Sequence, residues 1–174
     1  MMRHSTLVIG IIAIAFAGAG AWYSNHRSTP SAAEPAAVSA LFAQSFPDIS
    51  NTSRALAQWR GKPLLVNFWA TWCAPCVQEM PELSALQTEI GNTSIRIVGI
   101  GIDSASNIRE FAKKIPVTYP LLIGGMDASE LSRQLGNQAG GLPFTVLIDA
   151  DGRIRKTYLG RLKLDQLRRD LHDL

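Results

Sequence analysis

The two cysteines of the chain lie close together, at the point where a buried strand is predicted to end and a helix to begin. They stand in the run W-C-A-P-C at residues 72–76. The apolar residues 64–70 before them predict a buried strand. Apolar side chains at helical spacing over residues 74–90 predict a helix with one buried face. A pair of thiols at a strand-to-helix junction constrains the fold and the chemistry more than any other feature of the sequence.

Strands and helices alternate over residues 41–174, which are predicted to form the folded domain. This alternation predicts an α/β sandwich with a partly parallel sheet, ending in an antiparallel hairpin at Asp151-Gly152. Further strands are predicted at residues 95–102, 120–123, 144–149 and 153–158, and further helices at 104–115, 126–135 and 163–172.

The composition excludes a disordered chain and shows no sign of a nucleic-acid partner. Hydrophobic residues make up 47% of the chain and charged residues 18%, which is typical of a folded protein. The net charge is only +3, and no basic stripe with interleaved aromatic residues is present. We therefore expect no nucleic-acid binding.

An apolar segment near the N-terminus predicts a membrane anchor or a signal peptide over residues 1–23. Residues 5–25 contain no charged side chain, and as a helix they would span about 32 Å, close to the thickness of the bilayer hydrocarbon. The alternative is a signal peptide that is cleaved near Ala21. Residues 24–40, rich in serine and alanine, predict a flexible linker. Both alternatives place the following domain on the far side of a membrane.

Two structural explanations of the cysteine pair are weak. In the chain-entropy description, a disulfide that closes a loop of about four residues stabilises a fold by only about 2 kcal/mol. A zinc site needs four ligands, and the chain has no second C-x-x-C pair, so we expect no metal. Thiol–disulfide exchange is the remaining interpretation, because two intervening residues allow a disulfide across one helical turn.

The predicted start of the helix gives the two thiols different roles. Cys73 would lie at the helix N-terminus, where unpaired N–H groups and the helix dipole favour its thiolate. Cys76, one turn further and facing the core, would stay protonated and act as the resolving thiol. Pro75 suits the first helical turn, where its missing N–H is not needed. Trp72 adds flat apolar surface beside the pair.

The residues around the cysteines resemble the thioredoxin superfamily. The run V-N-F-W-A-T-W-C-A-P-C at residues 66–76, continued as V-Q-E-M-P-E-L, is similar to the TlpA/ResA/CcmG-like branch of extracytoplasmic thiol–disulfide oxidoreductases. The run G-L-P-F-T-V-L-I-D at residues 141–149 resembles a second motif of that branch. The resemblance implies a thioredoxin-like three-layer α/β/α sandwich with a mixed sheet. It also implies a cis peptide bond before Pro143, and a main chain at Leu142 that pairs with an extended substrate segment.

One departure from cytoplasmic thioredoxins concerns the proton of the resolving thiol. Those proteins carry a buried aspartate six residues before the first cysteine, where this chain has Asn67. Glu79 follows Cys76 by three residues, so the two side chains are neighbours on the predicted helix. The hypothesis is that Glu79 is partly buried, has a raised pKa and accepts the Cys76 proton. The alternative is a solvated helix residue.

Sequence and resemblance together predict an enzyme, a protein disulfide reductase outside the cytoplasm that needs no cofactor. The resemblance implies disulfide-bearing client proteins, such as apocytochromes c or copper-site assembly proteins, and a membrane thiol transporter as electron donor. Three alternatives stay open: a disulfide oxidase or isomerase of the same fold, a Cu(I)-binding carrier, and a peroxiredoxin-like peroxidase. Paired thiolates suit Cu(I). The resemblance disfavours the carrier, because copper carriers of the thioredoxin fold have a C-x-x-x-C pair and a distal histidine, whereas this chain has one residue fewer and its domain has His172 alone.

Overall fold

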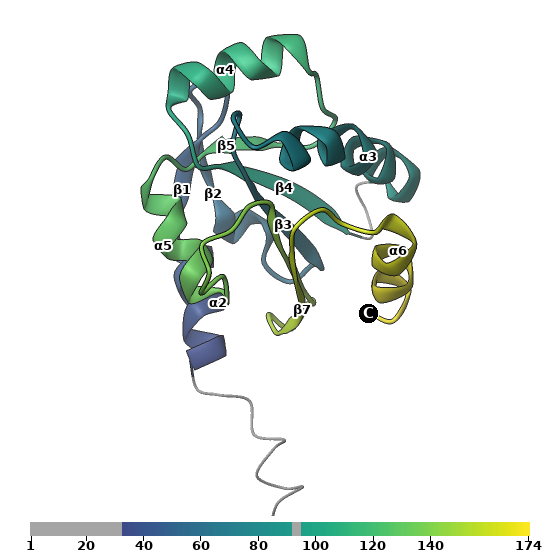
Figure 1. Ribbon diagram of the computed structural model, residues 1–174. Helices are drawn as coiled ribbons and strands as arrows, with labels where there is room; N and C mark the ends of the chain where they lie inside the picture. Colours follow the sequence, from purple (N-terminus) through teal and green to yellow (C-terminus); the bar gives the residue numbers. More distant parts are fainter. Residues whose placement is uncertain (1–32, 92–94) are drawn as a thin grey trace, which may run out of the picture. The chain divides into compact units, whose positions relative to one another are not determined.

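A five-stranded mixed sheet lies at the centre of the computed structural model, which describes residues 33–91 and 95–174 (Figure 1). The strand order is β5-β4-β3-β6-β7, in which β4 runs parallel to β3 and β5 while β6 is antiparallel to β3 and β7. All six residues of β3 are buried, because this central strand is covered on both faces. The strands are β3 Leu64–Trp69, β4 Arg96–Gly101, β5 Leu121–Ile123, β6 Phe144–Ile148 and β7 Ile154–Leu159.

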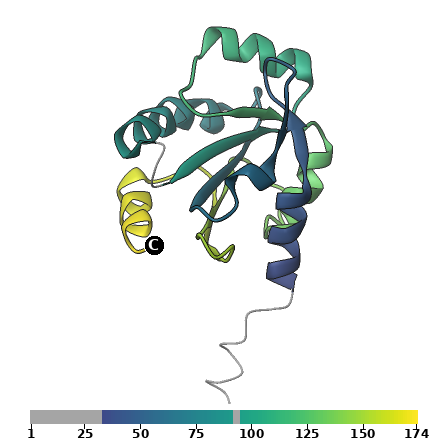
Figure 2. The same cartoon turned by 180° about the vertical axis from the view of Figure 1, so that it is seen from behind.

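Helices cover both faces of the sheet and complete a three-layer α/β/α sandwich, which confirms the expected thioredoxin-like architecture (Figure 1 and Figure 2). α3, α4 and α6 pack on one face, and α2 and α5 pack on the other. Each face has its own cluster of buried hydrophobic side chains. The helices are α2 Ala33–Ala43, α3 Ala74–Ile90, α4 Ala105–Lys114, α5 Asp127–Gln134 and α6 Leu164–His172.

The elements predicted after residue 63 agree with the observed ones to within one residue at each end. The sequence does not predict three short elements before that point, namely β1 Ser45–Pro47, β2 Ser53–Ala55 and the 3₁₀ helix η1 Leu56–Trp59. Strands of three residues are too short to show a hydrophobic period. The β1–β2 turn is instead held by Asp48, whose carboxylate accepts hydrogen bonds from the N–H groups of Ser50 and Thr52.

The linker predicted over residues 24–40 is wrong at its C-terminal end, because residues 33–40 form most of α2. One side of this helix is buried against the sheet through Ala37, Val38, Leu41 and Phe42. Alanine favours helix more than any other residue. This alanine-rich segment, which also packs through four apolar side chains, therefore forms a helix although its composition suggested a flexible linker. The folded domain therefore begins at residue 33 rather than at residue 41.

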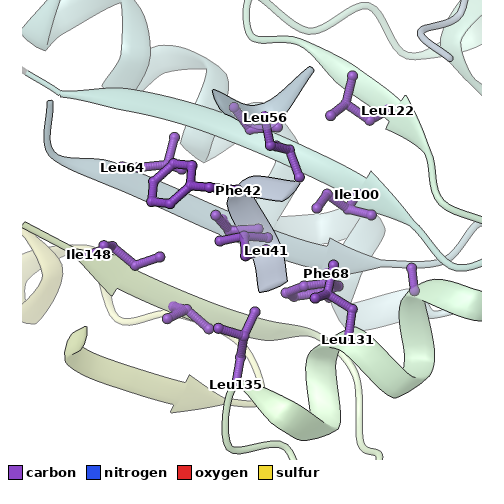
Figure 3. Packing of buried hydrophobic residues seen from close by; sticks show 14 of the residues in the cluster. Leu41, Phe42, Leu56, Leu64, Phe68, Ile100, Leu122, Leu131, Leu135 and Ile148 are labelled. Carbon is purple, nitrogen blue, oxygen red and sulfur yellow. The ribbon is translucent and has the colours of Figure 1, made fainter. Parts of the chain in front are cut away.

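Figure 3 shows how α2 completes the core on its face of the sheet. Leu41 and Phe42 lie among side chains from β3, β4 and η1, including Leu64, Ile100 and Leu56. The carboxylate of Glu34 also accepts a hydrogen bond of 2.9 Å from the Ile154 N–H at the start of β7. These contacts attach the start of the domain to strands that are distant in the sequence.

The predicted anchor or signal peptide over residues 1–23 lies outside the described residues, as do residues 24–32 of the predicted linker. Within the two described ranges, no helix has both the length and the apolar character that crossing a membrane requires.

Candidate active site

Cys73 and Cys76 form a disulfide at the junction of β3 and α3, with their Cα atoms 5.3 Å apart. Cys73 is the N-cap residue of α3, and its Sγ accepts a hydrogen bond of 3.3 Å from the Cys76 N–H. Cys76 is completely buried, whereas Cys73 is 5% exposed. The same N–H donor and the helix dipole favour a thiolate on Cys73 once the disulfide is reduced. Cys73 is therefore the more exposed of the two cysteines.

Two exposed side chains flank the disulfide. Trp72 is 71% exposed, whereas the neighbouring Cys73 is nearly buried. Pro75 is also exposed and occupies the first turn of α3, as expected. The turn that presents these residues is fixed by hydrogen bonds from the Cys73 N–H to the Ala70 carbonyl at 3.2 Å and from the Ile102 N–H to the Trp69 carbonyl at 2.7 Å.

The loop before β6 lies beside the cysteines. β6 pairs with β3 so that Phe144 is opposite Phe68, which places Pro143 at the end of β3 that leads to Cys73. The Leu142–Pro143 peptide bond is cis, which confirms the implication of the sequence resemblance. The Pro143 carbonyl accepts a hydrogen bond of 2.8 Å from the Gly160 N–H, and Leu142 packs against the cluster that contains both cysteines. The fold thus brings together the two motifs that are far apart in the sequence.

Glu79 is buried on the turn of α3 that follows Cys76. It is 1% exposed, and both of its carboxylate oxygens accept hydrogen bonds, one from Asn67 Nδ2 at 2.7 Å and one from the Leu162 N–H at 3.0 Å. Burial raises the pKa of Glu79 above its ordinary value, against the opposing effect of these two hydrogen bonds. Glu79 is thus a buried acid whose surroundings favour its protonated form, and its role as acceptor of the Cys76 proton stays a prediction.

Sequence reasoning did not find the hydrogen-bond partners of Glu79, neither Asn67 nor Leu162. Asn67 Nδ2 also donates a hydrogen bond of 3.0 Å to Thr145 Oγ1 of β6, so β3, β6 and α3 are joined by polar contacts. Leu162 contributes through its main chain, which no pattern of side chains reveals. The one available signal was the polar residue Thr145 within an otherwise apolar strand.

A second link that was not predicted joins the site to α4. Thr71 Oγ1 donates a short hydrogen bond to Asp103 Oδ2, and Asp103 Oδ1 accepts hydrogen bonds from the Ser104 N–H at 2.6 Å and from Asn107 Nδ2 at 2.8 Å. Burial acts to raise the pKa of Asp103, but these hydrogen bonds hold that pKa below its ordinary value. Asp103 is thus an ionised hydrogen-bond acceptor that links Thr71, the residue before Trp72, to the start of α4.

Within the described ranges, no group of three or more His, Cys, Asp or Glu side chains is placed to hold a metal ion. The site consists of a cysteine pair joined as a disulfide, a cis-proline loop, and a buried acid on the same helix as Cys76. Together with the three-layer fold, these features define a thiol–disulfide oxidoreductase of the thioredoxin superfamily.

Comparison with known proteins agrees with this class. Residues 37–171 match the Redoxin family. The thiol-disulfide oxidoreductase ResA of Geobacillus thermodenitrificans is 29% identical over 128 residues, which cover 73% of this chain and 71% of that protein. The thioredoxin-like protein YneN of Bacillus subtilis is 31% identical over 127 residues, which cover 71% of each chain. The chain therefore belongs to the Redoxin family, and within it is ResA/CcmG-like.

Solved structures show the same fold. The thioredoxin-related protein from Neisseria meningitidis serogroup B is 34% identical, with a TM-score of 0.63 over 70% of this chain and 91% of that one. The dsbF protein of MTB is 23% identical, with a TM-score of 0.66 over 77% of this chain and 96% of that one, and it supports the fold alone.

Proposed function

We propose that the protein reduces disulfides of client proteins, with Cys73 as the nucleophile and Cys76 as the resolving thiol. The observation that carries the proposal is the unequal burial of the two cysteines at the N-terminus of α3. The Cys73 thiolate attacks one sulfur of the client disulfide, and the other client sulfur leaves as a thiolate. Cys76 then loses its proton and attacks Cys73 Sγ, which releases the second client thiolate and forms the Cys73–Cys76 disulfide. Two electrons pass from the dithiol to the client.

Glu79 accepts the proton of Cys76 in this scheme. The carboxylate lies one helical turn beyond Cys76 and is shielded from solvent, so its raised pKa brings it closer to that of a thiol. The hydrogen bonds from Asn67 and Leu162 hold the carboxylate in place. Asn67 itself cannot ionise and acts as a donor.

The exposed surroundings of Cys73 bind the client. Leu142, next to the cis bond, offers its main chain to an extended client segment, and Pro143 keeps that loop against the cysteines. Trp72 and Pro75 supply apolar surface on the other side of the sulfur. Because the main chain makes the contact at Leu142, the site accepts clients with different side chains.

The reaction takes place outside the cytoplasm, with the domain held at the membrane by residues 5–25 or released after cleavage near Ala21. The apolar N-terminal run supports this location. A membrane thiol transporter re-reduces the Cys73–Cys76 disulfide. Tethering the domain to the same membrane raises the effective concentration of the domain near the transporter. Haem-attachment C-x-x-C-H sites of apocytochromes c and copper-site assembly proteins are suitable clients. The loop before Pro143 has no acidic residue, which favours a general reductase over one dedicated to apocytochromes.

Insulin reduction by the full chain, reduced beforehand, tests the proposal. Cys73→Ser is expected to abolish the activity, and Cys76→Ser is expected to abolish turnover while trapping mixed disulfides through Cys73. Ser39→Ala, which changes an exposed residue of α2, serves as the control and is expected to leave the activity unchanged. Trapping by Cys73→Ser instead of Cys76→Ser would contradict the assigned roles.

The direction of the reaction needs a separate measurement. Equilibration with glutathione gives the reduction potential of the Cys73–Cys76 pair. For a reductase, this potential is expected to be well below the value of about −120 mV of strong periplasmic oxidants. A potential near that value would show that the protein is an oxidase.

A further inference from the structure

Three of the five large hydrophobic side chains that are exposed in the described ranges lie at the end of the sheet that carries the disulfide. They are Trp72, Met126 and Leu159, which are 71%, 74% and 60% exposed. The other two are Ile49 in the β1–β2 turn and Leu174 at the C-terminus. Single exposed hydrophobic residues are common on protein surfaces, whereas a gathering of them is typical of a surface that binds another molecule.

Met126 stands after β5 as Trp72 stands after β3. The last residues of the parallel strands β3, β4 and β5 are paired in one row, which consists of Trp69, Gly101 and Ile123. Met126 and Trp72 each follow the end of their strand by three residues. The two glycine N–H groups between Ile123 and Met126 donate to the Gly101 carbonyl at 3.0 and 3.1 Å. Met126 therefore lies at the same end of the sheet as the disulfide, on the β5 side.

Leu159 lies on the other side of the disulfide, at the end of β7. It is paired with Phe144 of β6, which is paired with Phe68 of β3. A Cβ atom built on Gly141 would lie 3.0 Å from Leu159 Cδ1, so the Leu159 side chain packs against the main chain that leads to Leu142. Leu159 thus borders the loop that pairs with the client in the proposed function.

Met126 and Leu159 belong to the same face of the sheet. Met126 leads directly into α5, which packs on the face that α2 also covers. A Cβ atom built on Gly136, just after α5, would lie 3.8 Å from Thr157 Cγ2, so Thr157 of β7 faces α5. Leu159 is two residues further along the same strand and points the same way. One segment that crosses the strand ends can therefore contact both residues.

The spacing of the strands gives the length of a client segment that reaches both side chains. Met126 and Leu159 follow or end β5 and β7, each of which is two strands away from β3, the strand that leads to Cys73. Neighbouring strands are about 4.8 Å apart, so each side chain is displaced by about 10 Å from β3. An extended chain covers that distance in about three residues. Because alternate side chains of an extended chain face the same way, those two and four residues from the client cysteine face the domain together with it.

We propose that Met126 and Leu159 are specificity-determining residues, which bind apolar side chains of the client on the two sides of its reacting cysteine. The inference rests on the proposed function and names its substrate class. That class is an extended segment with apolar residues two or four positions before the cysteine and two or four positions after it. Methionine is flexible enough to fit side chains of different shapes. Continuity with the Leu142 loop favours a client segment over a second copy of this chain as the occupant.

A set of short synthetic peptides tests the proposal with the full chain, reduced beforehand. Each peptide has a central cysteine joined by a disulfide to 5-thio-2-nitrobenzoate. Leucine occupies the positions two and four residues before the cysteine, or those after it, or neither, and serine occupies the rest. The Cys73 thiolate attacks the peptide sulfur, and thionitrobenzoate leaves with the electron pair of the broken S–S bond. Cys76 then releases the peptide as a thiolate and forms the Cys73–Cys76 disulfide.

The rate constant for release of thionitrobenzoate is measured by absorbance. Leucine on either side is expected to raise it about tenfold over the all-serine peptide, which is the lower end of what full burial of a leucine side chain gives. Met126→Ser is expected to remove the preference for leucine on one side of the cysteine, and Leu159→Ser on the other side. Leu174→Ser is the matched control, because it changes another exposed leucine, and it is expected to retain both preferences.

The outcomes separate this inference from the proposed function. Equal rates on the leucine and serine peptides would overturn the inference alone, whereas release by Cys73→Ser as fast as by the parent would overturn the proposed function and the inference with it. Met126→Ser or Leu159→Ser with both preferences intact would exclude that residue from client binding. A parent dimer in size-exclusion chromatography that both variants dissociate would also overturn the inference, because a second copy of the chain would then occupy this surface.

Discussion

The start of the folded domain can be tested by deleting α2. A fragment of residues 33–174 retains this helix, and a fragment of residues 44–174 lacks it together with the buried side chains of Val38, Leu41 and Phe42. Burial of each such side chain contributes about 1.5–3 kcal/mol, so the three together contribute about 5–9 kcal/mol. The net stability of a domain is about 5–15 kcal/mol. The shorter fragment is therefore expected to lose most or all of its stability.

Urea unfolding followed by circular dichroism measures this difference. The longer fragment is expected to unfold in one cooperative transition, and the shorter one is expected to show none or a much lower midpoint. In the full chain, Leu41→Ala is expected to cost about 2–5 kcal/mol, whereas Ser39→Ala on the exposed side of the helix is expected to stay within about 0.5 kcal/mol. Equal midpoints for the two fragments would refute the assignment of α2 to the core.

Three further predictions concern the polar groups near the site. The parent is expected to lose stability as pH rises from 4.5 through the raised folded-state pKa of Glu79, because the folded protein then holds a buried charge. Glu79→Gln carries no such charge, so its stability relative to the parent is expected to increase over the same range. Urea titrations at several pH values would reject this if the difference stayed constant. Asp103→Ala is expected to cost about 1–3 kcal/mol at neutral pH. Because the folded pKa of Asp103 is lowered, that cost is expected to vanish as pH falls from 3.8 through the folded pKa, and a cost that persists in acid would count against ionised Asp103 as the acceptor. Gly99→Ala places a Cβ 2.8 Å from Leu121 Cδ2 and is expected to destabilise the fold by about 1–3 kcal/mol in urea unfolding; a neutral result would mean that the space beside Gly99 is larger than described.

The regular elements after residue 63 could be predicted because their hydrophobic periods are clear. The buried run of β3 and the stripe of α3 are both long enough to show their type, and their junction carries the cysteines. α2 was missed because Ala37 and Val38 are small and stand among serine, alanine and proline residues, where composition suggests a tether. Packing against the sheet stabilises the helix that the alanine residues favour.

The side chains of the site could be predicted from the sequence, but the hydrogen bonds that join them could not. The positions of Cys73, Cys76 and Glu79 follow from one helix, so local spacing sufficed. Among the donors to Glu79 and Asp103 are the main chain of Leu162 and the side chain of Thr71, each distant in the sequence from its acceptor. Such contacts depend on the tertiary fold, and a single sequence gives no signal for them.

The contrast in exposure between Trp72 and Cys73 has a consequence for selectivity. An incoming sulfur atom has to reach a residue that is only 5% exposed and that follows a tryptophan that is 71% exposed. A disulfide sealed inside a rigid globular protein cannot make that approach, whereas one on a pliant stretch of chain can. We therefore expect a client disulfide on a flexible segment to be reduced faster than one enclosed in a rigid fold, which a comparison of the same client in its unfolded and folded forms would measure.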